Sequence, residues 1–271
     1  MAHTTARIRP KQSLGQNFLI DDNIARNIVR DLQLHDDDIV LEIGPGQGAL
    51  TRHLAERAGH LIAVELDQRV IEELRQQFTS EKATIIHGDF LQVDLRELHE
   101  KFGQKLRVVG NVPYHLTSPI IFKVFEEHGH VRDLTIMVQK EVADRISASP
   151  STKAYGILSV MSRFHGEPKQ LFTVSPNCFY PKPKVTSSVI RMRLHESLPL
   201  STDAALLSTV VRTTFGKRRK TLRNGLQYLP MEEEMIRKIV AECPYSLERR
   251  PEELTVDDFI ALTHYIQQAI A

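Results

Sequence analysis

The sequence predicts an α/β protein with a Rossmann-like sheet, followed by a small all-helical domain. Through the first two-thirds of the 271 residues, short apolar and β-branched runs alternate with amphipathic helical segments. That alternation is typical of βαβ units around a parallel sheet. The first run ends in a glycine-rich turn of the kind that lies against nucleotide ligands. After about Glu196 the β-branched runs give way to helix-period segments.

The elements are expected in a simple order along the chain. Strands are predicted as apolar runs at residues 39–43, 61–65, 83–86, 107–109, 134–138, 170–174 and 187–193. Helices are predicted in the last part of the chain at residues 204–215, 232–241 and 256–270. Thr255 and Asp258 resemble an N-cap signature for the last helix. The expected organisation is an N-terminal basic arm at 1–20, a main domain at 21–197 and a helical domain at 198–271.

Composition excludes several classes of protein. With 41% hydrophobic and 25% charged residues, the chain reads as soluble and globular. Cys178 and Cys243 are the only cysteines and have no ligand spacing, so neither a disulfide framework nor a metal site is predicted. No run of about 18 apolar residues exists, so no membrane partner is expected. We therefore expect a cytoplasmic protein. A monomer is the default expectation, although none of these patterns addresses the oligomeric state.

An amide, a proline-constrained carbonyl and an aromatic ring stand together in Asn111-Val112-Pro113-Tyr114, directly after an apolar run. The residue before a proline is pushed out of the α region, so the Val112 carbonyl can lie beside the Asn111 side-chain oxygen. Two neighbouring acceptors can hold one NH2 group, and a base stacked on the Tyr114 ring gains roughly 1–3 kcal/mol. The tetrapeptide predicts a site for a base with an exocyclic amine. An ordinary turn is the alternative.

The first strand ends in a glycine turn that contains Gly44, Gly46 and Gly48. The next strand ends in Glu65, where a carboxylate can accept hydrogen bonds from both hydroxyls of a ribose. The third ends in Asp89 and Phe90, which can bind an adenine amine and pack on its face. Successive strand ends therefore build one nucleoside site at the carboxyl edge of the sheet. The glycine pattern fits NAD as well as S-adenosylmethionine, so both remain open at this point.

In this order, the glycine turn, Glu65, Asp89 and the tetrapeptide resemble class I S-adenosylmethionine-dependent methyltransferases that act on adenine N6. The segments Lys11–Leu19 and Phe179–Val185, with the helical tail, resemble the ribosomal RNA adenine N6-dimethyltransferase family. The resemblance runs from Lys11 to the C-terminal helices and is greatest to bacterial members that act on small-subunit (16S) rRNA. Val112 stands where the family usually has leucine, which leaves the carbonyl unchanged.

The resemblance implies transfer of methyl groups from S-adenosylmethionine to adenine N6, with S-adenosylhomocysteine as product and dimethyladenosine in 16S rRNA as the result. Two adjacent adenines in a 3′-terminal hairpin loop are the implied targets, within a 30S particle or its precursor. Phe179 would close over the target base opposite Tyr114. The implied cofactor-binding residues are Asn17, Leu19, Gly44, Gly46, Gly48, Glu65, Leu66, Asp89, Phe90 and Asn111.

Two basic clusters are candidates for binding the RNA backbone, although a charge run is often only a solvated face. The N-terminal cluster consists of Arg7, Arg9 and Lys11. The second cluster, in the predicted helical domain, consists of Lys217, Arg218, Arg219, Lys220 and Arg223.

Three other functions share part of this pattern. An NAD-dependent oxidoreductase would share the glycine turn and Glu65 but would leave the tetrapeptide unexplained. Large-subunit (23S) rRNA methyltransferases of the antibiotic-resistance type share the site motifs. A ribosome assembly factor whose methyl transfer is secondary is the third. A pyrimidine C5 methyltransferase is disfavoured because its Pro-Cys nucleophile is absent: Cys178 follows Asn177.

Overall fold

The computed structural model describes residues 9–11, 14–78, 81–199, 202–217 and 219–270. The chain divides into two compact units. The sheet unit comprises residues 1–143 and 169–194, and the helical unit comprises residues 144–168 and 195–271. The helical unit therefore takes in residues 144–168, which the sequence pattern places in the main domain. The reason is packing, because helix α7 (Ile157–His165) contacts α8 (Ala204–Phe215) and α11 (Val256–Ile270).

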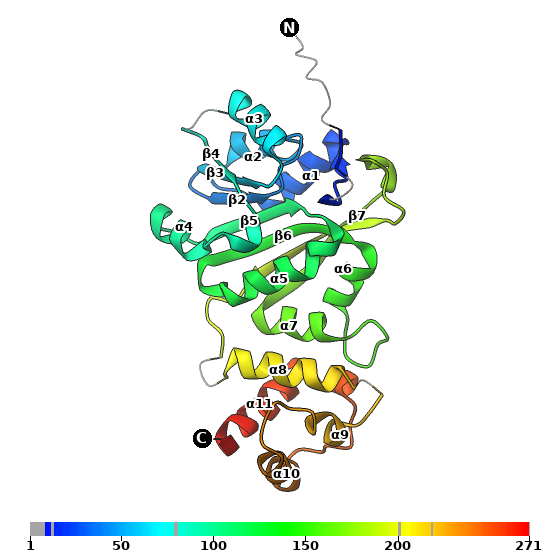
Figure 1. Ribbon diagram of the computed structural model, residues 1–271. Coiled ribbons are helices and arrows are strands. Elements are labelled where there is room, and N and C mark those ends of the chain that lie inside the picture. The colour runs from blue at the N-terminus through cyan, green and yellow to red at the C-terminus, as the bar shows by residue number, and fades with distance from the viewer. Residues whose placement is uncertain (1–8, 12–13, 79–80, 200–201, 218, 271) are drawn as a thin grey trace. The chain divides into compact units, whose positions relative to one another are not determined.

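A seven-stranded sheet forms the centre of the sheet unit (Figure 1). Its strand order is β4-β3-β2-β5-β6-β9-β7. The neighbours from β4 to β6 are parallel, whereas β9 is antiparallel to β6. The sheet is therefore mixed: its parallel part from β4 to β6 agrees with the predicted βαβ pattern, and β9 adds an antiparallel strand. The strands are β2 (Ile39–Ile43), β3 (His60–Glu65), β4 (Ala83–His87), β5 (Leu106–Asn111), β6 (Val131–Gln139), β7 (Gly166–Val174) and β9 (Ser187–Leu194).

A separate two-stranded sheet joins distant parts of the chain. Strand β1 (Phe18–Leu19) pairs antiparallel with β8 (Phe179–Tyr180), with Phe18 opposite Tyr180 and Leu19 opposite Phe179. The peptide N–H of Ile20 extends the pairing by donating to the Cys178 carbonyl at 2.9 Å. The N-terminal segment is thereby attached to the proline-rich loop.

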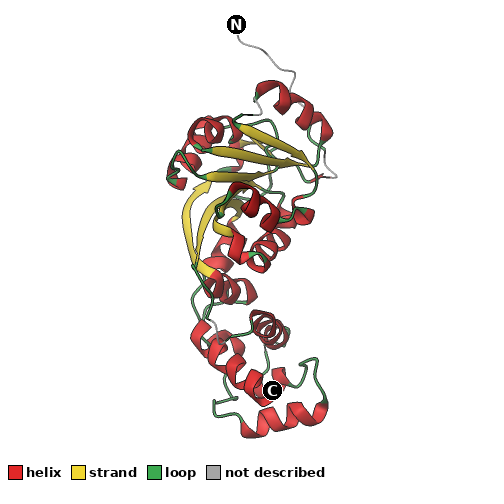
Figure 2. Cartoon of the chain, turned by 90° about the vertical axis from the view of Figure 1, so that its left-hand side faces the viewer, coloured by secondary structure: helices red, strands yellow, loops and turns green. Residues whose placement is uncertain are grey.

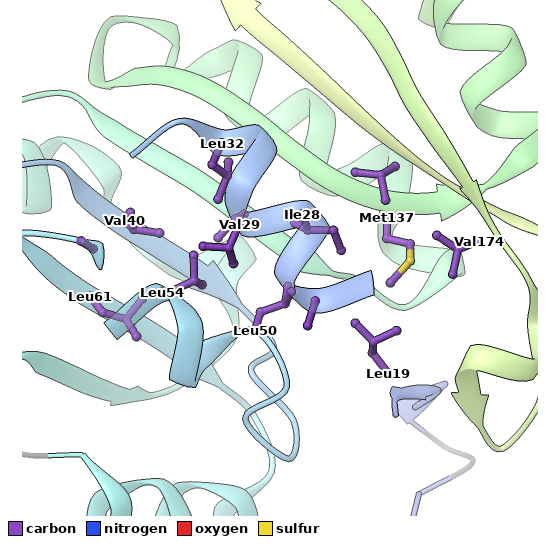
Figure 3. Packing of buried hydrophobic residues seen from close by; sticks show 14 of the residues in the cluster. Leu19, Ile28, Val29, Leu32, Val40, Leu50, Leu54, Leu61, Met137 and Val174 are labelled. Carbon is purple, nitrogen blue, oxygen red and sulfur yellow. The ribbon is translucent and has the colours of Figure 1, made fainter. Parts of the chain in front are cut away.

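Helices pack against the sheet, and Figure 2 shows helices on either side of the strands. Helices α1 and α2 bury apolar side chains against one face, where Val40, Leu61, Val109 and Met137 come from four different strands. Figure 3 shows Val40, Leu61 and Met137 in this cluster. The Asp21 side chain caps α1 by accepting from the N–H groups of the next turn. Helices of the sheet unit are α1 (Asp22–Leu32), α2 (Thr51–Arg57), α3 (Gln68–Gln77), α4 (Leu95–Phe102) and α5 (Thr117–Glu126). Helix α6 (Lys140–Ser147) contains the boundary between residues 143 and 144.

The helical unit also contains α9 (Leu222–Leu226) and α10 (Glu233–Glu242). Phe259 of α11 is fully buried, and the Tyr155 hydroxyl donates to the Leu254 carbonyl at 2.8 Å. The predicted cap of α11 is confirmed, because Thr255 Oγ1 accepts from Asp258 N–H at 3.1 Å while Asp258 Oδ2 accepts from Thr255 N–H at 2.9 Å. Helices α8 and α11 also agree with their predicted bounds.

A buried ion network lies at the amino end of β5. Arg107, only 1% exposed, donates to Asp38 Oδ2 at 2.7 Å and to Asp133 Oδ2 at 2.7 Å. It also donates to the carbonyls of Leu32 and Gln33 at the end of α1. One guanidinium therefore joins α1, the start of β2, β5 and β6, and its charge is compensated by two carboxylates.

Two further findings concern the described residues. None of their helices combines the length and the apolar character needed to cross a membrane. Within the same part of the chain, no three or more His, Cys, Asp or Glu side chains are grouped so that they could hold a metal ion.

Candidate functional site

A cavity of about 300 Å³ opens at the carboxyl ends of β2, β3, β4 and β5. The segment at residues 14–19 forms another part of its wall. The structure therefore brings together residues from five separate stretches of the chain. The predicted site residues that line this cavity are Asn17, Leu19, Gly44, Gly46, Glu65, Leu66, Asp89, Phe90, Asn111, Val112, Pro113 and Tyr114. Gly48 and Phe179 are not among the lining residues.

The glycine turn already uses its own amide groups. Gly44 and Gly46 have φ angles of 62° and 54°, which favour glycine. Gly44 N–H donates to the Val64 carbonyl at 2.9 Å, Gly46 N–H to Glu65 Oε2 at 3.2 Å, and Gly48 N–H to the Pro45 carbonyl at 3.0 Å. A dinucleotide pyrophosphate needs free N–H groups at such a turn. The hydrogen bonds of the turn therefore disfavour NAD.

The charge of the wall leads to the same conclusion. Its ionisable lining side chains are Glu42, Glu65, Asp89, Tyr114 and His115, and no lysine or arginine of the described residues lines the cavity. Acidic walls attract a cation and repel a pyrophosphate. A nucleoside that carries a sulfonium and an ammonium group fits this wall.

Glu65 is held by the backbone around it. Its Oε1 accepts from the N–H groups of Leu66 and Asp67 at 2.9 and 2.8 Å, and its Oε2 accepts from Gly46. Burial raises the pKa of the Glu65 carboxyl, and the three backbone donors lower it only in part. The carboxylate is thus oriented before any ligand arrives, as expected for a group that binds two hydroxyls.

Glu42 is a lining residue that the sequence prediction missed. It is 1% exposed, and within the described chain its Oε2 has no hydrogen-bond partner. Burial, reinforced by the neighbouring Glu65 charge, raises the pKa of Glu42 to about 8. The signal in the sequence was a carboxylate inside an otherwise apolar strand, two residues before Gly44. A buried carboxyl whose Oε2 has no hydrogen-bond partner in the described part of the chain is suited to bind a cationic ligand, because a nearby positive charge lowers the pKa of the carboxyl and favours its ionised form.

Glu42→Gln is expected to stabilise the ligand-free protein at pH 8, by on the order of a few kcal/mol. The pKa of Glu42 is raised on folding, so between about pH 4.5 and 8 the unfolded state ionises while the folded state keeps its proton. Stability therefore falls as pH rises through this window, and the glutamine removes that loss. Urea unfolding at pH 5 and pH 8 measures the effect. At pH 5 the wild-type protein and Glu42→Gln should have nearly equal free energies of unfolding. An equal difference between the two proteins at pH 5 and pH 8 would contradict the prediction.

Asp89, Phe90 and Leu66 line the cavity beside Glu65. Asp89 Oδ1 accepts from Leu91 N–H at 2.9 Å, which holds the exposed carboxylate in place at the end of β4. Phe90 is 4% exposed, and Leu66 is 51% exposed. An apolar side chain that is half exposed at a cavity can cover a flat ring. These three residues are arranged as a surface for a base and its amine.

Asn111 is oriented by a single hydrogen bond. Its Nδ2 donates to the Asn17 carbonyl at 2.9 Å. A carbonyl can only accept, so the amide nitrogen must face Asn17, and Oδ1 remains as an acceptor for a ligand. The Val112 carbonyl follows directly. No turn or loop hydrogen bond in the described chain uses it.

Tyr114 is fixed at its far end, because its hydroxyl hydrogen-bonds Ser187 Oγ at 2.8 Å. Burial raises the pKa of the Tyr114 hydroxyl, so this group stays neutral near pH 7. The ring itself lines the cavity beside Asn111 and Pro113. Its role in this geometry is a rigid face rather than an acid or a base.

Phe179 does not lie in the cavity. Its side chain is 3% exposed and packs in the apolar cluster with Leu19 and Val174. Pairing of β1 with β8 explains this placement, because Phe179 lies opposite the buried Leu19 while the next residue, Tyr180, is 52% exposed. In this structure the ring is a core residue, and it would have to leave the cluster to stack on a base.

The described members of the two basic clusters predicted to bind RNA lie outside the cavity lining. Lys11 forms an ion pair with Asp67 at 3.2 Å, and Arg223 forms one with Glu248 at 2.9 Å. Lys217 Nζ lies 4.2 Å from the centre of the Tyr228 ring. Arg9, Arg219 and Lys220 are exposed. Arg7 and Arg218 lie outside the described residues.

Comparison with known sequences places the chain among RNA-modifying enzymes. The family model described as "Ribosomal RNA adenine dimethylase" matches residues 7–267. A relative from Aromatoleum aromaticum named "Ribosomal RNA small subunit methyltransferase A" is 44% identical over 262 residues, covering 95% of this chain and 94% of the relative. A relative of the same name from Alkaliphilus oremlandii is 42% identical over 265 residues, covering 96% of this chain and 92% of the relative.

Solved structures share the fold. A dimethyladenosine transferase from Plasmodium falciparum superposes with a TM-score of 0.79 at 24% identity, covering 93% of this chain and 98% of the other. The 23S rRNA methyltransferase ErmE superposes with a TM-score of 0.67 at 24% identity, covering 93% of this chain and 100% of its own. At this identity the likeness concerns the mixed sheet and its helices.

Proposed function

The chain belongs to the ribosomal RNA adenine dimethylase family, and from this premise we propose that it dimethylates adenine N6 in small-subunit rRNA, with S-adenosylmethionine as methyl donor. The observation that carries the chemistry is the oriented Asn111 amide in the acidic cavity. Its Nδ2 is engaged by Asn17, so its Oδ1 and the adjacent Val112 carbonyl are two acceptors for one amine.

The cavity fits the cofactor. S-adenosylmethionine supplies a methyl group on a positively charged sulfur, already activated for transfer. Glu65 is placed for the ribose hydroxyls and Asp89 for the adenine amine. Glu42, buried and without a partner for Oε2, can pair with the positive charge of the cofactor. Gly44 and Gly46 keep the wall free of side chains where the nucleoside lies.

Positioning of the target amine is the main catalytic task. The N6 lone pair is delocalised into the purine ring, which makes the nitrogen a poor nucleophile. Asn111 Oδ1 and Val112 O accept the two N–H bonds and favour a tetrahedral nitrogen whose lone pair points at the methyl group. This interaction is stronger in the transition state than in the ground state, so it accelerates the reaction. After the first transfer, one of the two oxygens can hold the remaining N–H.

A base inside a helix cannot reach such a cavity, so the target adenine must be single-stranded, looped or flipped out. The Tyr114 ring offers a face for the extruded base, and its fixed hydroxyl keeps that face in place. Positioning and stacking suffice, because the nitrogen becomes acidic once it is alkylated and water can take the proton. The proposed mechanism therefore assigns no general base.

The small subunit is the proposed substrate because near-full-length relatives at 42% and 44% identity carry that name, whereas ErmE shares only 24% identity. We place the reaction on a 30S particle or its precursor and regard the enzyme as a monomer. An assembly role would accompany catalysis. Comparing ribosome assembly in a Glu65→Ala strain and a deletion strain separates the two contributions.

Mass spectrometry of nucleosides tests the proposal. Unmethylated 30S and 50S subunits are incubated separately with the protein and S-adenosylmethionine. Dimethyladenosine should form in the small-subunit rRNA only. Product in the large subunit alone would establish the antibiotic-resistance type of activity instead. Titration calorimetry should show binding of S-adenosylmethionine and none of NAD.

The double variant Lys220→Glu, Arg223→Glu is expected to bind rRNA more weakly and with a shallower salt dependence, because each lost phosphate contact lowers the slope of log K against log salt by about 0.7–0.9. Both side chains belong to the cluster in the helical unit, and Arg223 is already partly compensated by Glu248. Binding is measured at several salt concentrations, with Arg75→Glu, Lys82→Glu as the matched control. An unchanged slope would show that the cluster is only solvated.

A further inference from the structure

Asp67 lies two residues beyond Glu65, and its side chain is 0% exposed. It receives Lys11 Nζ on Oδ1 at 3.2 Å and Gln16 Nε2 on Oδ2 at 3.4 Å. Arg69 adds a hydrogen bond from Nε at 3.0 Å and one from its NH2 group at 2.6 Å. Hydrogen bonds from Arg69 lower the pKa of Asp67 and outweigh burial, so the carboxyl is ionised throughout the neutral range.

These contacts exceed what the start of α3 requires. Asp67 is the N-cap of that helix and accepts from Arg69 N–H at 3.3 Å, which one carboxylate oxygen suffices to do. Lys11 and Gln16 come from the N-terminal segment, more than fifty residues away along the chain. The Arg69 NH2 group also donates to the Arg9 carbonyl at 3.2 Å. The buried carboxylate therefore fastens a distant segment to the turn after β3.

That segment leads to the catalytic amide. Gln16 is fixed at both ends of its side-chain amide, because its Oε1 accepts from Lys11 N–H at 2.7 Å while its Nε2 donates to Asp67. The next residue, Asn17, carries the carbonyl that accepts from Asn111 Nδ2. Beyond it, Phe18 and Leu19 pair with β8. Asp67 and β8 thus hold the two ends of the stretch that orients Asn111.

We propose that Asp67 is a positioning residue for methyl transfer: by holding Lys11 and Gln16 it sets the Asn17 carbonyl, and this carbonyl turns the Asn111 oxygen toward the target amine. We call Asp67 with Lys11 and Gln16 the anchor. Asp67 N–H also donates to Glu65 Oε1, so the same turn carries Asp67 and the carboxylate proposed to bind the ribose. Cofactor binding at Glu65 and the orientation of the Asn111 amide are therefore linked. The inference rests on the proposed function of the cavity.

The role of Lys11 changes accordingly. The sequence predicts an RNA-binding lysine, but its ammonium is paired with a buried carboxylate, and its side chain is only 47% exposed. A paired cation releases fewer counterions from RNA than a free one. The structure thus makes Lys11 part of the anchor. Removal of an anchoring lysine should lower kcat, whereas removal of an RNA-binding lysine should raise KM for RNA.

The test compares Asp67→Asn with Lys11→Met. Asparagine is as good an N-cap as aspartate, so α3 should keep its start while the charge that holds Lys11 is lost. Each variant should lower kcat about tenfold, the factor given by a loss of ~1.4 kcal/mol, with KM for RNA within about twofold of wild type. Affinity for S-adenosylmethionine, measured by calorimetry, should fall several-fold. The double variant should have the same kcat as the less active of the two single variants, because both substitutions remove the same interaction between Lys11 and Asp67.

Asp94→Asn is the matched control, since Asp94 caps α4 by accepting from Glu97 N–H at 3.0 Å and, among the described residues, pairs with Arg96 rather than with the N-terminal segment. It should leave kcat at the wild-type value. Gln16→Ala should reproduce the loss in kcat seen with Asp67→Asn. All rates are measured well below the melting temperature of each variant.

Three outcomes would overturn the proposal. Lys11→Met could raise KM for RNA and flatten its salt dependence with kcat unchanged, which makes Lys11 an RNA contact. Asp67→Asn and Gln16→Ala could leave kcat and cofactor affinity at wild type, which makes the anchor only structural. Losses in Asp67→Asn and Lys11→Met could add in the double variant, which makes them independent. Wild-type protein that forms no dimethyladenosine would refute the proposed function itself.

Discussion

Asn111→Ala is expected to reduce the rate of methyl transfer by about 10²–10³-fold, the usual cost of removing one preorganised polar group that contacts the reacting atoms. The alanine removes Oδ1, one of the two acceptors for the target amine, together with the hydrogen bond to Asn17. The Val112 carbonyl alone cannot hold both N–H bonds. Single-turnover kinetics with saturating S-adenosylmethionine and unmethylated 30S subunits measure the effect.

Asn111→Asp is the sharper companion variant. Aspartate keeps the size of the side chain and an acceptor oxygen, but it cannot donate to the Asn17 carbonyl. A carboxylate oxygen would then face the Asn17 carbonyl oxygen, where Asn111 Nδ2 donates at 2.9 Å in the wild type. We expect the rate of methyl transfer to fall at least tenfold, because the side chain at position 111 loses its fixed orientation. Folding should persist, since the residue lies at a cavity wall and is only partly buried.

Cofactor affinity distinguishes two roles of Asn111. If it acts on the target amine, calorimetry should show S-adenosylmethionine binding to Asn111→Ala within about tenfold of wild type, far less than the loss in rate. A normal single-turnover rate with strongly weakened cofactor binding would contradict the mechanism. It would make Asn111 part of the cofactor site alone.

Regular periodicity explains which elements the sequence could predict. Strand β2 has the predicted bounds because five apolar or buried residues stand between polar segments, and α11 is bounded by its own capping residues. The β1–β8 pair was missed, because two short segments far apart in the chain carry no local signal for pairing. Local sequence likewise does not show that α7 packs with helices that follow residue 200.

The site was predictable where polar residues follow strands. Parallel strands end at the same edge, so Glu65, Asp89 and Asn111 could be placed together from their order alone. Glu42 was missed because it lies inside a strand, where a carboxylate reads as one polar residue in an apolar run. The contacts of Asp67 depend on how the N-terminal segment folds back, which no local pattern describes.

Phe179 shows a different limit. The family resemblance implied that its ring closes over the target base, but the direction of a side chain in a two-residue strand depends on its partner. Opposite the buried Leu19, Phe179 faces the core. A motif can therefore identify a residue near a site without fixing what the residue contacts there.

Arg107→Met is expected to destabilise the protein by about 3–5 kcal/mol, because two buried carboxylates lose the cation that they share. Arg191 on Asp133 and the exposed Arg132 on Asp38 compensate the remaining charge only in part. Arg107 holds Asp38 and Asp133 at 2.7 Å each, and its own side chain is 2% exposed. Methionine fills similar space but donates no hydrogen bond. Urea unfolding at pH 7 measures the loss. Arg132→Met is the control, since Arg132 is 54% exposed and should contribute less than about 1 kcal/mol.

The sign of the pH dependence follows from Asp38. Burial would raise the pKa of its carboxyl, but hydrogen bonds from His35 N–H and Arg107, with the arginine charges, outweigh burial and lower it. Asp38 therefore contributes stability above its unfolded pKa, and that stability is lost as pH falls. Without Arg107 the carboxyl pKa rises, so the gap between wild type and Arg107→Met should narrow from pH 7 toward pH 4. A constant gap would show that lost packing, not lost charge pairing, causes the destabilisation.

Strand β5 makes a further distinction testable in the same variant. Arg107 lies at its amino end and Asn111 at its carboxyl end, so one strand carries the ion network at one end and the catalytic amide at the other. Below its melting temperature, folded Arg107→Met should bind S-adenosylmethionine with nearly wild-type affinity, because the cavity lining contains no member of the network. A large loss of affinity in the folded variant would mean that the network sets the position of β5 relative to β2 and β6.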